Sequence, residues 1–292
     1  MPSIEESRPL SLSLFVPAFC GLLCLLMLLS EAPVADASVA ILRFAGLGVA
    51  SVIADLVATR WPHWRKFIHP VAAGALIFSI YSALSLAIPW LIPEEREWYL
   101  LGFDRRWLGY FWESWWSGFN HPLLSDGLQL LYVSFYLFPF LFGLRLAWKR
   151  DWSGLYSGTD RLILGFLLCY CGYMLVPTRS PYAFVEYSEP LLSYGLQPIL
   201  HAALVETAWT KRDCFPSGHT MMSVYLAWLG WQRVRELSWI LIPWAVLTVV
   251  ATLYLRYHFL IDVLVGLATC AGWIWLSERL FGRFREHTGS RT

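Results

Sequence analysis

The chain has 292 residues, of which 57% are hydrophobic and only 15% are charged. Soluble domains usually carry about 25% charged residues, so this composition excludes an ordinary soluble domain and indicates a membrane protein. The net charge of +1 gives no electrostatic reason to expect a nucleic-acid partner.

Eight apolar segments follow one another along the chain, each close to the roughly 20 residues that a membrane-spanning helix needs. They predict an all-α, polytopic membrane bundle of about eight transmembrane helices. The stretch 98–118 is rich in tryptophan and phenylalanine but carries four charged residues, so it predicts a helix lying in the membrane interface. The segments lie near 12–30, 38–59, 69–92, 123–146, 161–178, 217–234, 238–254 and 257–277.

Lysine and arginine are distributed unevenly between the two ends of these segments. If both termini are cytoplasmic, 14 of the 22 lysines and arginines lie on the cytoplasmic side and 7 on the opposite side. This bias follows the positive-inside rule, so we expect the polar motifs to face the extracytoplasmic side of a bacterial inner membrane. Glu5 and Glu6 precede the first apolar segment, where a signal peptide would be basic, so we expect no cleaved signal.

Most cysteines and two neighbouring tyrosines are best interpreted as packing residues. Five of the six cysteines lie in apolar segments, where cysteines are mostly inert. Cys214 is the one beside a polar motif, and we expect it to be a small packing residue as well. Tyr132 and Tyr136, four residues apart on the fourth segment, are likewise expected to pack.

His258 and Asp262 begin the last apolar segment. Ionisable residues in a membrane are costly and are therefore functional candidates by default. Four residues apart on a helix, these two share one face. A carboxylate that bonds one imidazole nitrogen fixes the tautomer and raises the basicity of the other nitrogen, as a nucleophilic histidine requires. A purely structural His–Asp pair is the alternative.

Pro216-Ser217-Gly218-His219 begins the sixth segment. Unpaired backbone N–H groups at a helix N-terminus attract anions, so the amides of Ser217 and Gly218 are expected to bind phosphate. His219 could donate a proton to a leaving oxygen, although a histidine at a helix start also often serves as a cap. The arginines nearby could snorkel and a Lys-Arg pair could simply be solvated, which are the alternatives to phosphate binding. The basic candidates for phosphate binding are Arg179, Lys211, Arg212 and Arg256.

At these motifs the sequence resembles the type 2 phosphatidic acid phosphatase superfamily. Pro216-Ser217-Gly218-His219 matches its second motif in full, and His258 with Asp262 matches the core of its third. The resemblance covers roughly residues 95–278. It implies a six-helix phosphatase-like core within 69–292, preceded by two additional transmembrane helices in 1–68. It also implies that His258 is the nucleophile, Asp262 its orienting partner and His219 the acid.

The chain departs from the family's motifs at two basic positions. Gly172 stands where the first motif has lysine, and Thr252 stands where the third motif has arginine. Arg256 is basic but lies only two residues before His258. These departures resemble the inositol phosphorylceramide synthase branch, which transfers a phosphorylated head group between lipids. The similarity to that branch also includes Tyr254-Leu255 and Leu175-Val176-Pro177.

Three functions remain open at this point. The first is an integral-membrane lipid phosphatase that acts on a phosphate monoester or diphosphate through a phosphohistidine resolved by water. The second is a head-group phosphotransferase of the inositol phosphorylceramide synthase type, in which an alcohol replaces water. The third is a non-enzymatic phospholipid-binding or transport protein, against which the intact histidines argue. We expect no cofactor and no metal, since no carboxylate cluster of the kind that magnesium prefers is present. The expected partners are a lipid phosphate and the bilayer, and the oligomeric state is left open.

Overall fold

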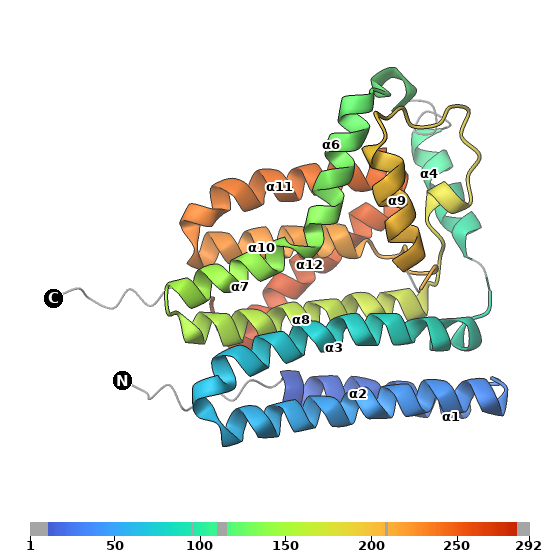
Figure 1. Ribbon diagram of the computed structural model, residues 1–292. Helices are drawn as coiled ribbons and strands as arrows, with labels where there is room; N and C mark the ends of the chain where they lie inside the picture. Colours follow the sequence, from blue (N-terminus) through green and yellow to red (C-terminus); the bar gives the residue numbers. More distant parts are fainter. Residues whose placement is uncertain (1–10, 95, 110–115, 208–209, 285–292) are drawn as a thin grey trace.

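The computed structural model describes residues 11–94, 96–109, 116–207 and 210–284. These residues form helices and loops, and the β-structure among them is one isolated bridge between Thr178 and Asp213. The prediction of an all-α fold is therefore confirmed. Figure 1 shows most of the long helices side by side, with shorter helices and loops gathered at one end.

Each of the eight predicted apolar segments contains a helix. The predicted interfacial stretch 98–118 also begins as a helix, α4, while residues 110–115 lie outside the described residues. The elements are η1 Ser11–Phe15, α1 Val16–Leu29, α2 Val34–Arg60, α3 Pro62–Leu91, α4 Glu97–Leu108, η2 Trp116–Phe119, α6 Pro122–Val133, η3 Ser134–Tyr136, α7 Phe138–Trp148, α8 Trp152–Leu175, η4 Pro181–Ala183, α9 Leu196–Thr207, α10 Gly218–Arg233, α11 Arg235–Tyr254 and α12 Leu260–Phe281.

Five helices in the described ranges are long and apolar enough to cross a membrane: η1 with α1, α2, α3, α11 and α12. The bent pair α6 and α7 makes a sixth candidate. The predicted count of about eight is not confirmed, because α10 has only 16 residues and α8 begins with a polar stretch that contains Asp160 and Arg161. The helices were thus predicted correctly, whereas the number of spans is five to six by length and composition.

The fourth predicted segment is broken rather than continuous. The short η3 helix separates α6 from α7, and the two halves are bent by 52°. Pro139 has no N–H group to donate, so it is tolerated in the first turn of α7. Trp244 of α11 donates from Nε1 to Ser134 Oγ over 2.9 Å, which holds the break against α11. A cavity lies beside this break.

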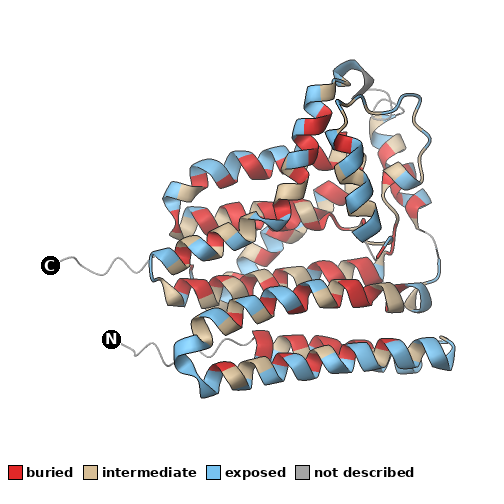
Figure 2. Cartoon of the chain, viewed as in Figure 1, coloured by how far each residue is buried: buried red, intermediate tan, exposed pale blue. Residues whose placement is uncertain are grey.

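The N-terminal pair α1 and α2 lies at the edge of the bundle next to α3 (Figure 1). A buried polar cluster joins it to the remaining helices. Ser11 Oγ donates to Asp160 Oδ1 over 2.5 Å, and His69 Nε2 lies 3.2 Å from the same oxygen. The outer face of the pair is apolar and exposed (Figure 2), as helices surrounded by lipid require.

Helix α4 supports the end of the bundle where α10 and α12 begin (Figure 1). Asp104 accepts the backbone N–H groups of Leu260 and Ile261 over 2.7 and 3.1 Å, at the first turn of α12. At the other end of α4, Glu97 pairs with Arg179 over 2.6 Å. Helix α4 therefore connects the start of α12 to the loop that follows α8, and both histidine motifs lie at this end.

Candidate active site

Asp262 lies in the first turn of α12, but His258 lies in a bend two residues before that helix begins, so the prediction that both residues share one helical face is wrong. Asp262 is fully buried, and its Oδ2 accepts the Phe259 N–H over 2.9 Å. The same oxygen lies 3.5 Å from His258 Nδ1. A proton on Nδ1 that faces this carboxylate leaves the lone pair on Nε2. Because His258 also lines a cavity, this arrangement suits a nucleophile.

Cys214 belongs to the same cluster, so its interpretation as a packing residue was incomplete. Its Sγ donates to Asp262 Oδ2 over 2.8 Å and lies 3.5 Å from His258 Nδ1. Burial raises the pKa of the Cys214 thiol, and the Asp262 carboxylate raises it further. The thiol therefore keeps its proton and gives Asp262 a second hydrogen bond, which helps to hold the carboxylate in place.

His219 faces His258 from the first turn of α10. The two ring centroids are 6.3 Å apart, which leaves room for a phosphorus atom between the imidazoles. Tyr132 Oη lies 3.1 Å from His219 Nδ1, and the tyrosine ring stacks on the imidazole at 4.1 Å. His219 Nε2 is buried without a hydrogen-bond partner. Tyr132 therefore orients the histidine as well as packing against it, and Nε2 is the atom left for proton transfer.

Ser217 and Gly218 begin α10 and have different surroundings. Ser217 Oγ accepts the Thr220 N–H over 3.2 Å as the N-cap, and the Ser217 N–H donates to the Asp262 carbonyl oxygen over 3.1 Å. Gly218 lines the cavity, and a Cβ at this position would lie 2.2 Å from Tyr173 Oη. The Ser217 amide is thus already paired within the protein, and Gly218 is the residue of the two that faces the cavity.

A cavity of about 1030 Å³ leads from the histidines along the helices. Its walls come mainly from α3, α7 and α8, and it reaches from Lys66 to His219 and His258. Tyr81 also lines it and follows Lys66 by 15 residues on α3. That separation is about 22 Å at 1.5 Å per residue. The cavity therefore extends through much of the roughly 30 Å hydrocarbon core of a bilayer.

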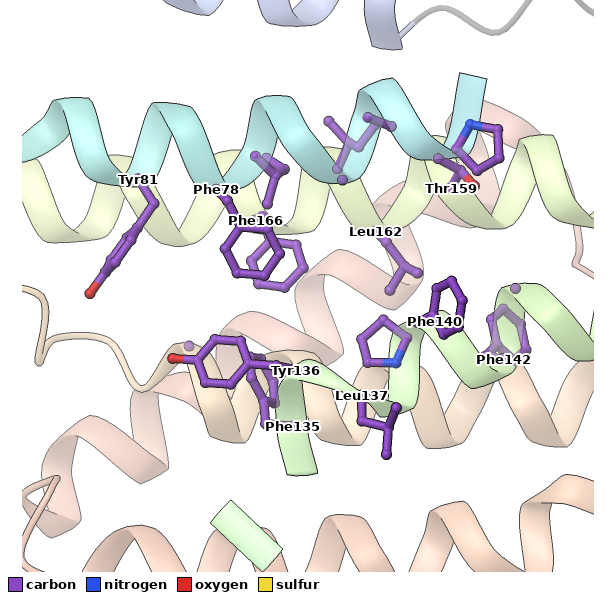
Figure 3. Close-up of a pocket in the computed structure, with 18 of the residues that line it drawn as sticks. Phe78, Tyr81, Phe135, Tyr136, Leu137, Phe140, Phe142, Thr159, Leu162 and Phe166 are labelled. Atoms are coloured by element: carbon purple, nitrogen blue, oxygen red, sulfur yellow. The ribbon is translucent and has the colours of Figure 1, made fainter. Parts of the chain in front are cut away.

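The cavity is mostly apolar and opens to the side of the bundle. Figure 3 shows side chains of α3 and α8 facing those around η3 and α7 across it. Phe78, Leu137 and Phe140 line it and are 53%, 50% and 65% exposed. Large exposed apolar side chains of this kind are suited to contact lipid chains. The apolar lining is suited to hydrocarbon, and the two histidines lie at one end of the cavity.

Two of the four basic residues predicted to bind phosphate, Arg179 and Lys211, lie close in sequence to the bridge between Thr178 and Asp213. Arg179 Nε is ion-paired with Glu97 Oε1 over 2.6 Å. Burial opposes ionisation of Glu97, but hydrogen bonds from Arg179 outweigh it and hold the pKa of this carboxyl below its usual value. Lys211 is exposed. Neither cation lines the cavity.

The other two basic candidates contact backbone carbonyls outside the cavity. Arg212 Nη1 donates to the Pro93 carbonyl oxygen over 3.2 Å. Arg256 has a φ angle of 65° and stacks on Tyr187 at 3.9 Å, while its Nη2 donates to the Glu189 carbonyl oxygen over 2.7 Å. The structure therefore does not gather the four predicted cations beside the histidines, and their contact with phosphate stays a prediction.

The two departures from the family's motifs have a local structural reason. A Cβ at Gly172 would lie 2.2 Å from Pro216 Cδ, so the absence of a side chain lets α8 approach the Pro-Ser-Gly-His motif closely. Thr252 is fully buried, and its carbonyl oxygen accepts the N–H groups of Tyr257 and His258, each over 3.0 Å. A long basic side chain fits neither position without rearrangement.

Asp213 is a site residue that the sequence analysis did not single out. An aspartate beside Lys211-Arg212 is typical of a solvated loop, yet its carboxyl lines the cavity and accepts a hydrogen bond from the Tyr81 hydroxyl. Burial raises the pKa of Asp213, and the Tyr81 hydrogen bond opposes this shift. A carboxyl group therefore lies in the same cavity as His219 and His258.

One group among the described residues has the spacing of a metal site. Potential ligand atoms of Cys214, His258 and Asp262 all lie within 4.8 Å of one another. Thiolate, imidazole and carboxylate are the ligands that zinc prefers, so zinc bound here would take the atoms that orient His258. The hydrogen bonds of this cluster already account for its geometry without a metal.

The fold and the site together define a class of protein: a helical membrane protein with two facing histidines at one end of the bundle. Residues 180–286 match the sequence model of the PAP2 superfamily. The match contains both histidine motifs, so the predicted resemblance is confirmed for the superfamily. The inositol phosphorylceramide synthase branch is not confirmed and stays a prediction.

The chain is also similar to a PA-phosphatase related-family protein of Dictyostelium discoideum, at 22% identity over 173 residues. The match covers 52% of this chain and 31% of that protein, so the chain spans about a third of this relative's length. No solved structure matches the chain. The match to the PAP2 superfamily model supports a phosphatase-type function on lipids.

Proposed function

We propose that the protein is an integral-membrane lipid phosphatase that transfers the phosphoryl group of a lipid phosphate through a phosphohistidine on His258. The observation that carries this proposal is the pair of imidazoles 6.3 Å apart, one oriented by Asp262 and the other by Tyr132, at the end of an apolar cavity. An apolar cavity suits the lipid chain, and two histidines suit transfer of the phosphoryl group.

The chemistry follows from which nitrogens are already paired. His258 Nε2 attacks phosphorus while Nδ1–H stays directed at Asp262. The bond from phosphorus to the leaving oxygen breaks, and protonated His219 supplies the proton from Nε2 while its Nδ1–H donates to the Tyr132 oxygen. Water then attacks the phosphohistidine and gives its proton to His219, and the N–P bond breaks. Gly218 at the N-terminus of α10 provides a backbone N–H toward the phosphate oxygens.

A head-group phosphotransferase is the second candidate, because of the charges along the cavity. A phosphate monoester carries close to two negative charges at pH 7, whereas a diester carries one. None of the four predicted phosphate-binding cations lines the cavity, and Asp213 does. This balance favours a singly charged diester as the phosphoryl donor. The same phosphohistidine would then be attacked by a lipid alcohol in place of water.

The proposed orientation puts the histidine end of the bundle on the extracytoplasmic side, on the basis of the lysine and arginine distribution. Single cysteines at exposed positions test it: Lys211→Cys near the histidines and Lys149→Cys at the other end of α8. In intact cells, an impermeant thiol reagent is expected to label the first variant and to label the second only after lysis. The reverse pattern would invert the orientation.

The enzymatic proposal is tested with purified protein, a panel of lipid phosphates and His258→Ala. We expect the wild-type protein to release phosphate or to form a new phospholipid when a lipid alcohol is present, which separates the two candidates. The folded His258→Ala variant should lose nearly all turnover. Retention of more than about a tenth of the activity, equivalent to about 1.4 kcal/mol of barrier, would contradict the nucleophile assignment.

A further inference from the structure

Asp213 introduces a carboxyl group that the phosphoryl chemistry does not use. Its carboxyl lines the same cavity as His219 and His258 and is hydrogen-bonded to Tyr81. A carboxylate in the same cavity as the phosphate binding position would repel the phosphate unless a positive charge lay between them or beside them. Lys66 is far from this end of the cavity, since 15 residues of α3 separate it from Tyr81. Protonated His219 is positive only until it gives its proton to the leaving oxygen, so the substrate itself is the best source of a positive charge that lasts through the reaction.

Aromatic rings surround the same end of the cavity. Tyr81, Tyr136 and Tyr173 line it, and the Tyr81 hydroxyl donates a hydrogen bond to Asp213. Figure 3 shows the hydroxyl groups of Tyr81 and Tyr136 at the same end of the cavity. Tyr136 is 45% exposed, so its ring is available to a ligand.

Aromatic rings together with a carboxylate are the combination that binds an organic ammonium ion. The face of a tyrosine ring attracts a cation, most strongly where water is excluded, and the carboxylate adds a full opposite charge. Tyrosine hydroxyl groups can bind a neutral polyol as well, but only a cation compensates the charge of a carboxylate in an apolar cavity. The chemistry at this end of the cavity therefore favours ammonium over sugar or inositol.

We propose that Asp213, Tyr81 and Tyr136 form a subsite for the cationic head group of a phosphodiester lipid of the ethanolamine or choline type. This inference rests on the phosphohistidine chemistry of the proposed function and names its donor. In an ethanolamine or choline phosphodiester, one oxygen and two carbons separate phosphorus from nitrogen. Phosphorus can therefore lie between the two histidines while the ammonium group contacts Asp213.

The group-transfer step balances with the residues present. His258 Nε2 attacks phosphorus, the bond from phosphorus to the diacylglycerol oxygen breaks, and protonated His219 gives that oxygen its proton. The head group stays esterified to the phosphohistidine, with its ammonium at Asp213. The oxygen of a lipid alcohol, or of water, then attacks phosphorus, loses its proton to His219, and the N–P bond breaks. The products are a new phospholipid or a free phosphorylated head group, together with diacylglycerol.

The test compares phospholipids that share their acyl chains and differ only in the head group. Purified protein in mixed micelles is given phosphatidylethanolamine, phosphatidylcholine, phosphatidylglycerol or phosphatidylinositol, with phosphatidic acid as a monoester, and diacylglycerol is measured. The variants are Asp213→Asn, which keeps the size of the side chain and an acceptor for Tyr81, and Glu94→Gln as a matched control at an exposed position.

We expect wild-type protein and Glu94→Gln to prefer the two cationic head groups. Asp213→Asn should lower kcat/KM for those two lipids by about tenfold or more and should leave phosphatidic acid unchanged or faster. An equal loss on all lipids would assign Asp213 a purely structural role. A preference for phosphatidylinositol or phosphatidylglycerol would overturn the assignment of the head group.

A binding measurement separates failure of the subsite from failure of the proposed chemistry. His258→Ala protein, which cannot turn over, is titrated with spin-labelled phosphatidylcholine and with phosphatidylglycerol carrying the same label. Selective binding of the choline lipid that Asp213→Asn removes would support the subsite even if no turnover were found with any lipid. Equal binding of the two lipids would refute the subsite, whatever the outcome of the activity assays.

Discussion

Gly172 is expected to be essential because of how closely α8 approaches the Pro-Ser-Gly-His motif. A Cβ at this position would lie 2.2 Å from Pro216 Cδ and 3.0 Å from its Cγ. Ordinary carbon contacts begin near 3.5 Å, so Gly172→Ala must move the proline ring by about 1.3 Å. The atoms involved belong to a ring closed on the backbone, so the shift passes directly to Ser217, Gly218 and His219.

The magnitude follows from two opposing effects. Overpacking of this kind costs about 1–3 kcal/mol, while replacing a helical glycine by alanine returns at most about 0.5–1 kcal/mol, since Gly172 lies in the last turn of α8. Gly172→Ala should therefore lower the unfolding temperature modestly. Activity should fall much further, since a misplacement of about 1 Å at a reacting group costs about 100-fold.

The assay is kcat/KM on the lipid substrate together with thermal unfolding in detergent. Gly46→Ala on α2 is the matched control, because a Cβ there meets nothing within 4 Å. The control should keep full activity and unfold at the same or a higher temperature. If Gly172→Ala matched the wild type in both measurements, or if Gly172→Lys strengthened phosphate binding as the family motif suggests, the packing argument would be refuted.

Three further predictions follow from the site and its support. Tyr132→Phe loses the hydroxyl group that holds His219 Nδ1, so it should lower kcat about tenfold with little change in KM. A substrate with a more acidic leaving group should recover most of the loss, whereas an equal loss on both substrates would mean that Tyr132 only packs. Activity should persist in a chelator, whereas added zinc should inhibit the wild type more strongly than Cys214→Ser; loss of activity in chelator that magnesium restores would refute metal independence. Burial raises the pKa of Asp104 from 3.8 to about 6, so the folded protein holds this proton more tightly than the unfolded chain, and the contribution of Asp104 to stability falls as pH rises between 3.8 and about 6. Asp104→Asn should remove that fall from unfolding temperatures measured across this pH range, and an unchanged pH profile would contradict the assignment.

The helices were predictable because long apolar runs leave few alternatives in a membrane protein. It was harder to predict where a helix is interrupted. The run 123–146 has the length of one span, yet the chain breaks at η3, and the only local signal is Pro139 three residues beyond that break. The number of spans differs for a similar reason, since α8 and α10 are helical without being both long and apolar throughout.

The helix starts that carry His219 and Asp262 were predictable from the apolar segments, whereas His258 lies in the bend before α12, so helical spacing does not explain its position. The contacts of the four basic residues were not predictable, because these residues belong to loops. Arg256 illustrates the difference: its positive φ angle directs the side chain to Tyr187, and no spacing rule reveals such a turn. Asp213 was missed, and Cys214 was interpreted only as a packing residue. Each residue is ordinary by type, and only the tertiary fold brings it to His258.

The lateral opening of the cavity has a consequence for how the reaction rate should be described. Phe78, Leu137 and Phe140 are exposed on the side of the bundle that would meet lipid chains. A substrate that enters there diffuses in two dimensions and never leaves the bilayer. Its supply is then set by its mole fraction among the surrounding lipids, not by its concentration in the solution. Diluting the substrate with inert detergent at constant bulk concentration should therefore slow turnover, the behaviour known as surface dilution.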